Sequence, residues 1–176
     1  SVELEPPLLP GLFAGPWTAR EPLAIDELPT HVVDAVLAAE DVRFLSHPGL
    51  DFPSLARAIQ VNWEAQAVRQ GGSTITQQVI KTQFLTQERT LGRKLRELPM
   101  ALALELHFEK RDILECYLAT VYLGHDGLLG VYGFAEGARA YFGKRPAELT
   151  IGEAATLAGM IRAPNPLSPL RHPERA

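Results

Sequence analysis

The sequence predicts a mainly α-helical domain. Apolar residues recur at spacings of three and four through most of the chain, and hardly any segment alternates between apolar and polar residues as a half-buried strand would. Thr74 and Thr150 are each followed three residues later by a glutamine or glutamate, the pattern of a capping box at a helix start. The chain has 176 residues, of which 46% are hydrophobic and 22% charged, which is enough for one globular core. We therefore expect a domain over residues 30–176, preceded by an arm over residues 1–29.

The arm is rich in proline and its apolar residues follow no period, so we expect an extended segment that lies on the domain. A linker next to a membrane is the alternative. No stretch reaches the ~18 consecutive apolar residues that a membrane-spanning helix needs. Because the chain starts and stops abruptly, we expect a fragment of a longer, membrane-anchored protein.

Two helices are expected in the first part of the domain. The first has its N-cap at Thr30 and ends at Glu40. Asp51 can cap the second helix, which has Pro53 in its first turn and continues to about Val68.

A third helix follows two glycines at the capping box of Thr74 and Gln77. Gln77, Gln78 and Lys81 lie on one side of this helix by their spacing, and the amides of a helix start suit an anion. A polar helix face is ordinarily exposed to solvent, but this combination also suits a ligand with phosphate and hydroxyl groups. The residues alone leave both interpretations open.

The next two helices follow a polar segment, residues 85–92, which we expect to form a mobile flap. A long helix is capped near Thr90 and should kink or restart at Pro99. Another apolar helix opens at Lys110 and ends at Gly124.

The last part of the chain should contain a loop and two helices. Glycines recur from Gly124 to Gly130, which predicts the loop. A short helix follows from Phe134 to Tyr141, and the final helix starts at Thr150 and is ended by the prolines beyond residue 163.

A dense group of ionisable residues marks the end of the first helix. Glu40 and Asp41 add negative charge where a helix already carries partial negative charge, so these acids do not stabilise it. Arg43, His47 and the turn former Pro48 follow at once. Stability given up in this way indicates a functional site, although a solvated helix end is the simpler reading of this segment alone.

Bulk charge and composition exclude some functions. The net charge of -4 and pI near 5.7 argue against a nucleic-acid partner. The single Cys116 cannot form an internal disulfide, and the scattered histidines show no metal-ligand spacing, so no metal site is predicted from spacing.

Five blocks in order resemble one family, the peptidoglycan glycosyltransferase domain (glycosyltransferase family 51) of class A penicillin-binding proteins. The longer glycine-rich loop is similar to that of the 1b-type members. The blocks are Glu40-Asp41-x-x-Phe44-x-x-His47-x-Gly49, Gly72-Ser73-Thr74-Ile75-Thr76-Gln77-Gln78-x-x-Lys81, Arg93-Lys94-x-x-Glu97, Lys110-x-x-Ile113-Leu114-Glu115-x-Tyr117-Leu118, and Tyr141-Phe142-Gly143-Lys144 leading to Glu153-Ala154-Ala155-x-Leu157-Ala158-Gly159.

The resemblance implies a lysozyme-like helical fold with a membrane-proximal lobe. It implies that lipid II is polymerised into β-1,4 glycan strands, by inverting transfer with release of undecaprenyl pyrophosphate, on the periplasmic face of the bacterial cytoplasmic membrane. The partners it implies are lipid II, the growing glycan strand, the membrane surface, moenomycin-type inhibitors and an attached transpeptidase domain.

The resemblance also implies roles by position. Glu40 is the general base that takes the proton of the acceptor 4-hydroxyl as it attacks the anomeric carbon of the donor chain. Glu97 is the second catalytic acid, and it stays open whether it organises Arg93 or a divalent cation, Mg2+ or Mn2+, on the pyrophosphate; no organic cofactor is implied. His47 braces the first block rather than transferring protons. The residues expected to contact substrate are Asp41, Phe44, His47, Ser73, Thr74, Gln77, Gln78, Lys81, Arg89, Arg93 and Lys94.

The chain departs from the family pattern at Thr82 and Ala119, where asparagine is usual, and at Pro99. These departures bear on rate and packing, because the acids and the basic cluster are present. Two other functions stay open: a non-catalytic module that binds lipid II or a partner, and a lysozyme-like muramidase, which would need two carboxyls across a glycosidic bond but no basic cluster.

Overall fold

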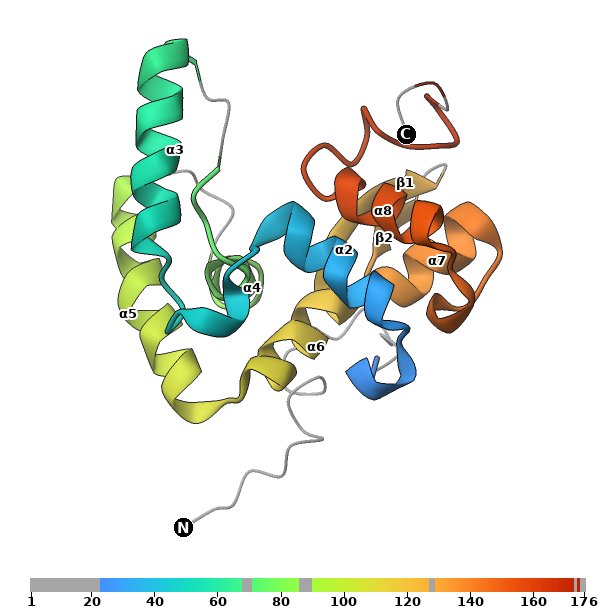
Figure 1. Cartoon of the computed structure of the whole chain (residues 1–176), viewed down its shortest axis with the longest axis horizontal. Helices are drawn as coiled ribbons and strands as arrows, with labels where there is room; N and C mark the ends of the chain where they lie inside the picture. The colour runs from blue at the N-terminus through green and yellow to red at the C-terminus, as the bar shows by residue number, and fades with distance from the viewer. Residues whose placement is uncertain (1–22, 68–70, 86–89, 127–128, 173, 175–176) are drawn as a thin grey trace. The chain divides into compact units, whose positions relative to one another are not determined.

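The protein is described by a computed structural model over residues 23–67, 71–85, 90–126, 129–172 and 174, and Figure 1 shows that these residues are mainly helical. The predicted fold class is confirmed. The α-helices are α2 (Thr30–Glu40), α3 (Phe52–Ala65), α4 (Ile75–Gln83), α5 (Leu91–His107), α6 (Lys110–Thr120), α7 (Phe134–Phe142) and α8 (Ile151–Met160). Short 3-10 helices are η1 (Ile25–Glu27), η2 (Phe44–Ser46) and η3 (Pro146–Glu148), and the strands are β1 (Tyr122–Asp126) and β2 (Leu129–Tyr132).

The chain divides into two compact units. The terminal unit comprises residues 1–42 and 114–176, and the central unit comprises residues 43–113. The predicted arm over residues 1–29 lies mostly outside the described residues; its described part contains η1.

The core of the terminal unit is built where α2 packs on α8. Val32 and Val36 of α2 and Leu157 of α8 are completely buried. The capping box predicted at the start of α8 is confirmed, because Thr150 and Glu153 exchange both side-chain to backbone hydrogen bonds. At the start of α2 the prediction was wrong by one residue: Pro29 is the N-cap and Thr30 is already helical.

A β-hairpin replaces the predicted end of one helix and the loop after it. α6 ends at Thr120, and β1 pairs with the antiparallel β2, with Tyr122 opposite Tyr132. Gly124 has a positive φ of +104°, and a Cβ there would lie 3.0 Å from the carbonyl oxygen of Pro164. Gly124 therefore serves a close backbone approach within a strand.

Gly137 allows α7 to pack closely against β1. A Cβ at this position would lie 2.5 Å from Cδ1 of Leu123, so a larger residue would require the buried Leu123 side chain to shift. This contact sets how near β1 and α7 approach within the terminal unit.

The central unit begins with α3, and its predicted cap is confirmed. Oδ1 of Asp51 accepts a hydrogen bond of 2.9 Å from the amide of Ser54, and Pro53 lies in the first turn. The helix ends at Ala65, before the predicted Val68, because Gln66 adopts a left-handed conformation with φ 46°.

α4 and α5 pack against each other in the central unit. The capping box of Thr74 and Gln77 at the start of α4 is confirmed, as is the cap of α5 by Thr90. α5 continues through Pro99, so of the two outcomes predicted there, a kink or a restart, the restart does not occur.

Candidate functional site

Glu40 is the last residue of α2, and its side chain is only 9% exposed. The neighbouring Asp41 is the C-cap of α2 and is also buried. Two adjacent carboxylates at a helix end are therefore held inside the terminal unit rather than in bulk solvent, which is an arrangement that costs stability unless other groups support it.

Tyr117 of α6 lies within electrostatic range of both acids. Burial raises the pKa of its hydroxyl, and the negative charges of Glu40 and Asp41 raise this pKa further. The hydroxyl therefore keeps its proton throughout the physiological range and remains a hydrogen-bond donor beside two carboxylates.

Arg162 is a residue of this site that the sequence analysis missed. Its Nε lies 3.9 Å from Oε1 of Glu40, and its Nη2 donates a hydrogen bond to the carbonyl oxygen of Ala39. That carbonyl is among the last of α2, which lack partners within the helix. The available signal was a single cation placed directly after the apolar end of the last predicted helix.

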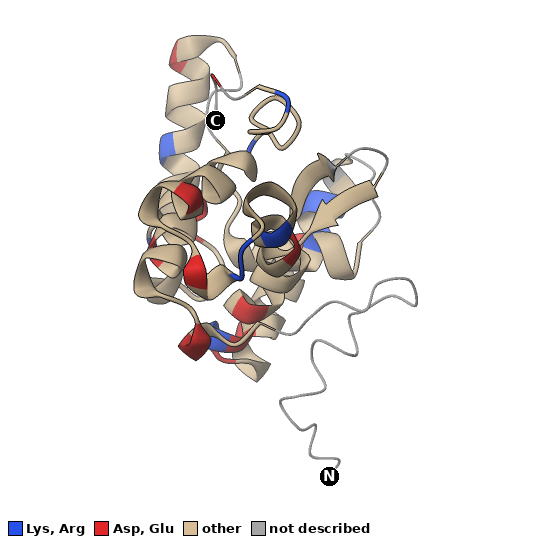
Figure 2. Ribbon diagram, turned by 90° about the vertical axis from the view of Figure 1, so that its right-hand side faces the viewer, with Lys and Arg blue, Asp and Glu red and all other residues tan. Residues whose placement is uncertain are grey.

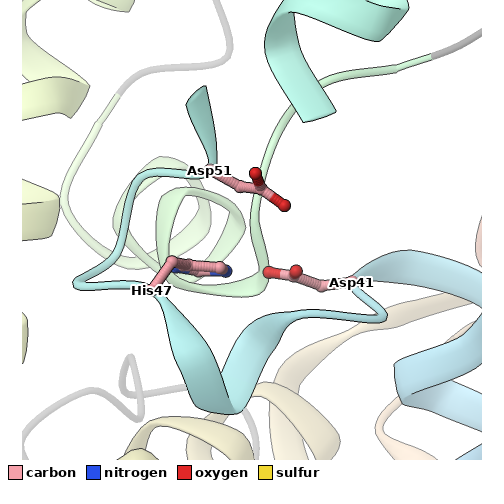
Figure 3. A group of neighbouring side chains, drawn as sticks. All are labelled: Asp41, His47 and Asp51. Atoms are coloured by element: carbon pink, nitrogen blue, oxygen red, sulfur yellow. The ribbon is translucent and has the colours of Figure 1, made fainter. Parts of the chain in front are cut away.

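The segment after the acids is folded by its own side chains. Nδ1 of His47 accepts a hydrogen bond of 3.1 Å from the amide of Gly49, and the Arg43 guanidinium forms an ion pair with Asp51. Figure 3 shows His47 and Asp51 of this segment, and Asp41 at the end of α2. His47 thus contacts the backbone of its own block, in keeping with the bracing role predicted for it.

Burial alone would raise the pKa of Asp51, but hydrogen bonds from Ser54 and from Arg43 outweigh it and lower this pKa to about 2. Asp51 is therefore ionised throughout the physiological range. It caps α3 and pairs with Arg43 at the same time.

Phe44 was predicted to contact substrate, but its side chain is completely buried. The ammonium of Lys110 lies 4.3 Å from the centre of its ring, a cation–π contact within the central unit. Because no part of the ring reaches the surface, we assign Phe44 to the support of the segment rather than to substrate contact.

Glu97 forms ion pairs with two basic residues of the central unit, Arg93 and Lys94. Its carboxylate, 2% exposed, pairs with Arg93 and accepts a hydrogen bond of 2.7 Å from Nζ of Lys94. Nζ of Lys94 also donates a hydrogen bond of 3.0 Å to Oγ of Ser73, just before α4. The fold thus unites two of the blocks found in the sequence, although they are far apart along the chain.

The backbone amides at the start of α4, which the sequence analysis considered for anion binding, form hydrogen bonds within the helix cap. The Thr74 amide donates a hydrogen bond of 3.1 Å to Oε1 of Gln77, and the Gln77 amide donates one of 3.1 Å to Oγ1 of Thr74. Oγ1 of Thr74 also donates a hydrogen bond of 2.7 Å to the carbonyl oxygen of Gly49. The capping box thus engages both of these amides and one lone pair of the Gln77 side-chain oxygen.

The remaining predicted contacts lie along α4. Gln78 is half-buried and Lys81 is exposed, while Arg89 lies outside the described residues, as do residues 86–89 of the predicted flap. In the view of Figure 2, basic and acidic residues are interspersed along the ribbon of the described residues.

A pocket of about 370 Å³ in the terminal unit contains none of the predicted site residues. It is lined by residues next to the start of α2, including Glu27 and Leu28, and by Arg139, Lys144 and Arg145. Glu40 lies at the other end of α2, so the chemistry predicted for Glu40 does not take place in this pocket.

Comparisons with known proteins give one consistent result. A family model described as Transglycosylase matches residues 12–176. Penicillin-binding protein 1A of Aquifex aeolicus (strain VF5) is 47% identical over 154 residues, which cover 88% of this chain and 21% of that protein. Penicillin-binding protein 1B of Vibrio cholerae is 43% identical over 175 residues, 99% of this chain and 22% of that protein. Penicillin-binding protein 1F of Bacillus subtilis (strain 168) is 42% identical over 156 residues, 89% of this chain and 21% of that protein. The chain thus spans about a fifth of the length of these relatives.

Proposed function

Because this chain belongs to the transglycosylase family, we propose that it is a peptidoglycan glycosyltransferase that polymerises lipid II into β-1,4 glycan strands. The observation that carries the proposal is the carboxylate of Glu40, which is enclosed at the end of α2 beside the Arg162 guanidinium. A base held in this way keeps a fixed direction toward a bound hydroxyl.

In the proposed reaction Glu40 takes the proton from the 4-hydroxyl of the acceptor sugar. The oxygen attacks the anomeric carbon of the donor chain as the bond from that carbon to the pyrophosphate breaks. The bonding electrons leave with undecaprenyl pyrophosphate, and the configuration at the anomeric carbon inverts.

The leaving group needs positive charge where its own negative charge develops. Arg93 and Lys94 supply it in the central unit, and Glu97 holds both of them while neutralising one of their two charges. Lys94 reaches Ser73 and its side chain is 41% exposed, so it can turn to a phosphate oxygen. Lys81, exposed on α4, is proposed to act with them.

We propose that Glu97 organises these cations rather than ligating a metal. Arg93 bonds one of its carboxylate oxygens and Lys94 the other, so a directly bound Mg2+ or Mn2+ would compete with at least one of these cations. A divalent cation carried by the pyrophosphate itself remains a prediction, and no step above depends on it.

An exposed apolar stripe in the central unit supports the proposed membrane contact. Phe52, Leu55, Ile59 and Trp63 recur on one side of α3 and are between 42% and 81% exposed. Among the described residues no helix is long and apolar enough to cross a bilayer. We propose that α3 lies in the interface of the bacterial cytoplasmic membrane, on its periplasmic face, where the lipid tail of the substrate is anchored.

The test is polymerisation of lipid II in detergent by the purified chain and by its Glu40→Gln variant. The wild type should yield glycan strands, and the variant should lose about two to four orders of magnitude in rate, as expected when a general base is removed. Unchanged far-UV circular dichroism and thermal unfolding serve as the control that the variant is folded. Near-normal chain growth in Glu40→Gln would remove the assignment of the base.

The two other functions give different results in the same assay. A muramidase would release soluble fragments from finished peptidoglycan and make no polymer. A non-catalytic module would bind lipid II without converting it. The basic cluster around Glu97 favours the transferase, because a pyrophosphate leaving group needs it and hydrolysis of a glycosidic bond does not.

A further inference from the structure

We propose that Tyr122, His125 and Tyr132, on the β1–β2 hairpin, form a subsite that binds a sugar ring of the acceptor substrate. None of these residues is among those predicted from the sequence to bind substrate. The inference rests on the proposed function, which it extends by assigning a place to the acceptor.

The three side chains form one aromatic cluster in the terminal unit. The ring centres of Tyr122 and Tyr132 are 5.2 Å apart, and those of Tyr122 and His125 are 5.5 Å apart at an interplanar angle of 78°. A hydrogen bond joins the Tyr122 hydroxyl to Nδ1 of His125. Tyr132 is 41% exposed, so the cluster offers ring surface and polar atoms together.

The hairpin that carries the cluster is held firmly in the terminal unit. The Gly133 amide donates a hydrogen bond of 2.7 Å to the carbonyl oxygen of Val121, directly beside the paired Tyr122 and Tyr132. The buried hydroxyl of Tyr141 donates a hydrogen bond of 2.8 Å to the carbonyl oxygen of Leu123. Rings fixed in this way lose little conformational entropy when a ligand binds.

A series of contacts connects the cluster to the proposed base. Arg162 contacts Glu40 and the carbonyl of Ala39, and three residues later Oδ1 of Asn165 lies 3.4 Å from Nδ1 of His125. Three residues span at most about 11 Å of chain. A saccharide that places a hydroxyl at Glu40 could therefore extend its next rings toward the hairpin.

The chemistry of the cluster matches a pyranose ring. One side of such a ring carries mostly C–H bonds, which pack on an aromatic face, while its hydroxyl groups at the edge need hydrogen-bond partners. Tyr132 supplies exposed ring surface. Tyr122 supplies a hydroxyl oxygen that is bonded to Nδ1 of His125 and keeps a lone pair, and His125 supplies Nε2.

The acceptor rather than the donor is the fitting occupant. In the proposed reaction the acceptor hydroxyl must reach Glu40, which belongs to the same unit as the hairpin. The cations assigned to the pyrophosphate of the donor, Arg93 and Lys94, belong to the central unit.

If the tyrosines had a purely structural role, their substitution would change the kinetic constants and the stability in a different way. A cross-strand aromatic pair contributes to hairpin stability, and its loss would lower stability and kcat together. A binding role should instead raise KM while kcat stays nearly constant. The test therefore measures KM, kcat and thermal unfolding on the same variants.

The experiment uses the whole chain with lipid II and, separately, with a soluble GlcNAc–MurNAc disaccharide as the probe in saturation-transfer NMR. Tyr132→Ala should raise KM for lipid II about fivefold to tenfold, with kcat within about twofold, and should weaken saturation transfer to the disaccharide. Tyr132→Phe, which keeps the ring, should behave almost as the wild type. Leu129→Ala is the matched control, because Leu129 is an exposed apolar residue on the same hairpin.

An unchanged KM in Tyr132→Ala, or a fall in kcat and stability with KM unchanged, would overturn the inference. So would equal effects of Tyr132→Ala and Leu129→Ala. A wild type that makes no glycan but binds the disaccharide in a Tyr132-dependent manner would refute the proposed function and still support the sugar subsite.

Discussion

Glu40 would destabilise an isolated helix, and its neighbours explain why it is tolerated. Arg162 binds the carbonyl of Ala39 and brings positive charge to the negative end of α2. The same guanidinium faces Glu40, so one side chain both supports the helix end and places a cation beside the proposed base.

Replacing Arg162 with alanine should affect activity far more than stability. We expect kcat/KM for lipid II to fall about tenfold to a hundredfold, because the proposed base loses a positioning contact. The free energy of unfolding should fall by less than about 1 kcal/mol, because the Arg162 side chain is 69% exposed. Arg162→Lys should recover part of the activity, and an alanine variant with wild-type kinetics would exclude Arg162 from the site.

Glu97 is a buried carboxylate that forms ion pairs with Arg93 and Lys94. In Glu97→Gln, Arg93 and Lys94 would repel each other without a counter-charge, so we expect a loss of about 3 kcal/mol in the free energy of unfolding and a raised KM. The control is Glu136→Gln, which breaks the exposed pair with Arg139 and should cost less than about 0.5 kcal/mol. Urea unfolding measures both, and equal losses would contradict the central role given to Glu97.

At the scale of elements, the cap of α3 makes stability depend on pH. Asp51 has a pKa of about 2 in the folded chain against an ordinary value of 3.8, so folding favours its ionised form. The stabilisation is complete above about pH 4 and is lost as the pH falls toward 2.

The Asp51→Asn variant isolates this contribution, because asparagine can still cap the helix. The difference in free energy of unfolding between wild type and variant should be constant from pH 7 down to about pH 4 and should shrink below it. Urea titrations at a series of pH values measure the difference, and one that does not change with pH would show that Asp51 is not perturbed by folding.

The exposed stripe on α3 predicts binding to lipid bilayers. The double variant Ile59→Ser with Trp63→Ser should reduce co-sedimentation with vesicles of phosphatidylglycerol and phosphatidylcholine about tenfold or more, since both side chains lose apolar area that would be buried in the interface. A matched control removes two exposed apolar residues of the terminal unit, Ile151→Ser with Leu170→Ser. Equal losses in the two variants would argue against a specific membrane face on α3.

Some elements could be predicted from the sequence and others could not. The caps at Asp51, Thr74, Thr90 and Thr150 were found because each joins residues three apart, so its signal is complete within one turn. The hairpin was missed because its strands are short, contain glycine and are fixed by contacts with α7 and with Pro164. Propensity in so short a segment is overruled by such contacts.

At the scale of the whole molecule, the terminal unit is assembled from the two ends of the described chain. Nε2 of His31 lies 2.7 Å from the carbonyl oxygen of Leu149, a contact between residues 118 positions apart. The amide of Ile25 donates a hydrogen bond of 2.9 Å to Oε1 of Glu115. The proposed base belongs to this unit, and the cations assigned to the leaving group belong to the other.

The sequence by itself determined the helical class, most helix starts, the family blocks and the unusual acids at 40 and 41, because each depends on neighbours along the chain. Only the tertiary structure decided that Phe44 is buried, that Lys94 reaches Ser73 and that Arg162 lies beside Glu40. These features depend on which segments pack together. Burial and long-range ion pairs are properties of that packing, and no local pattern of residues encodes them.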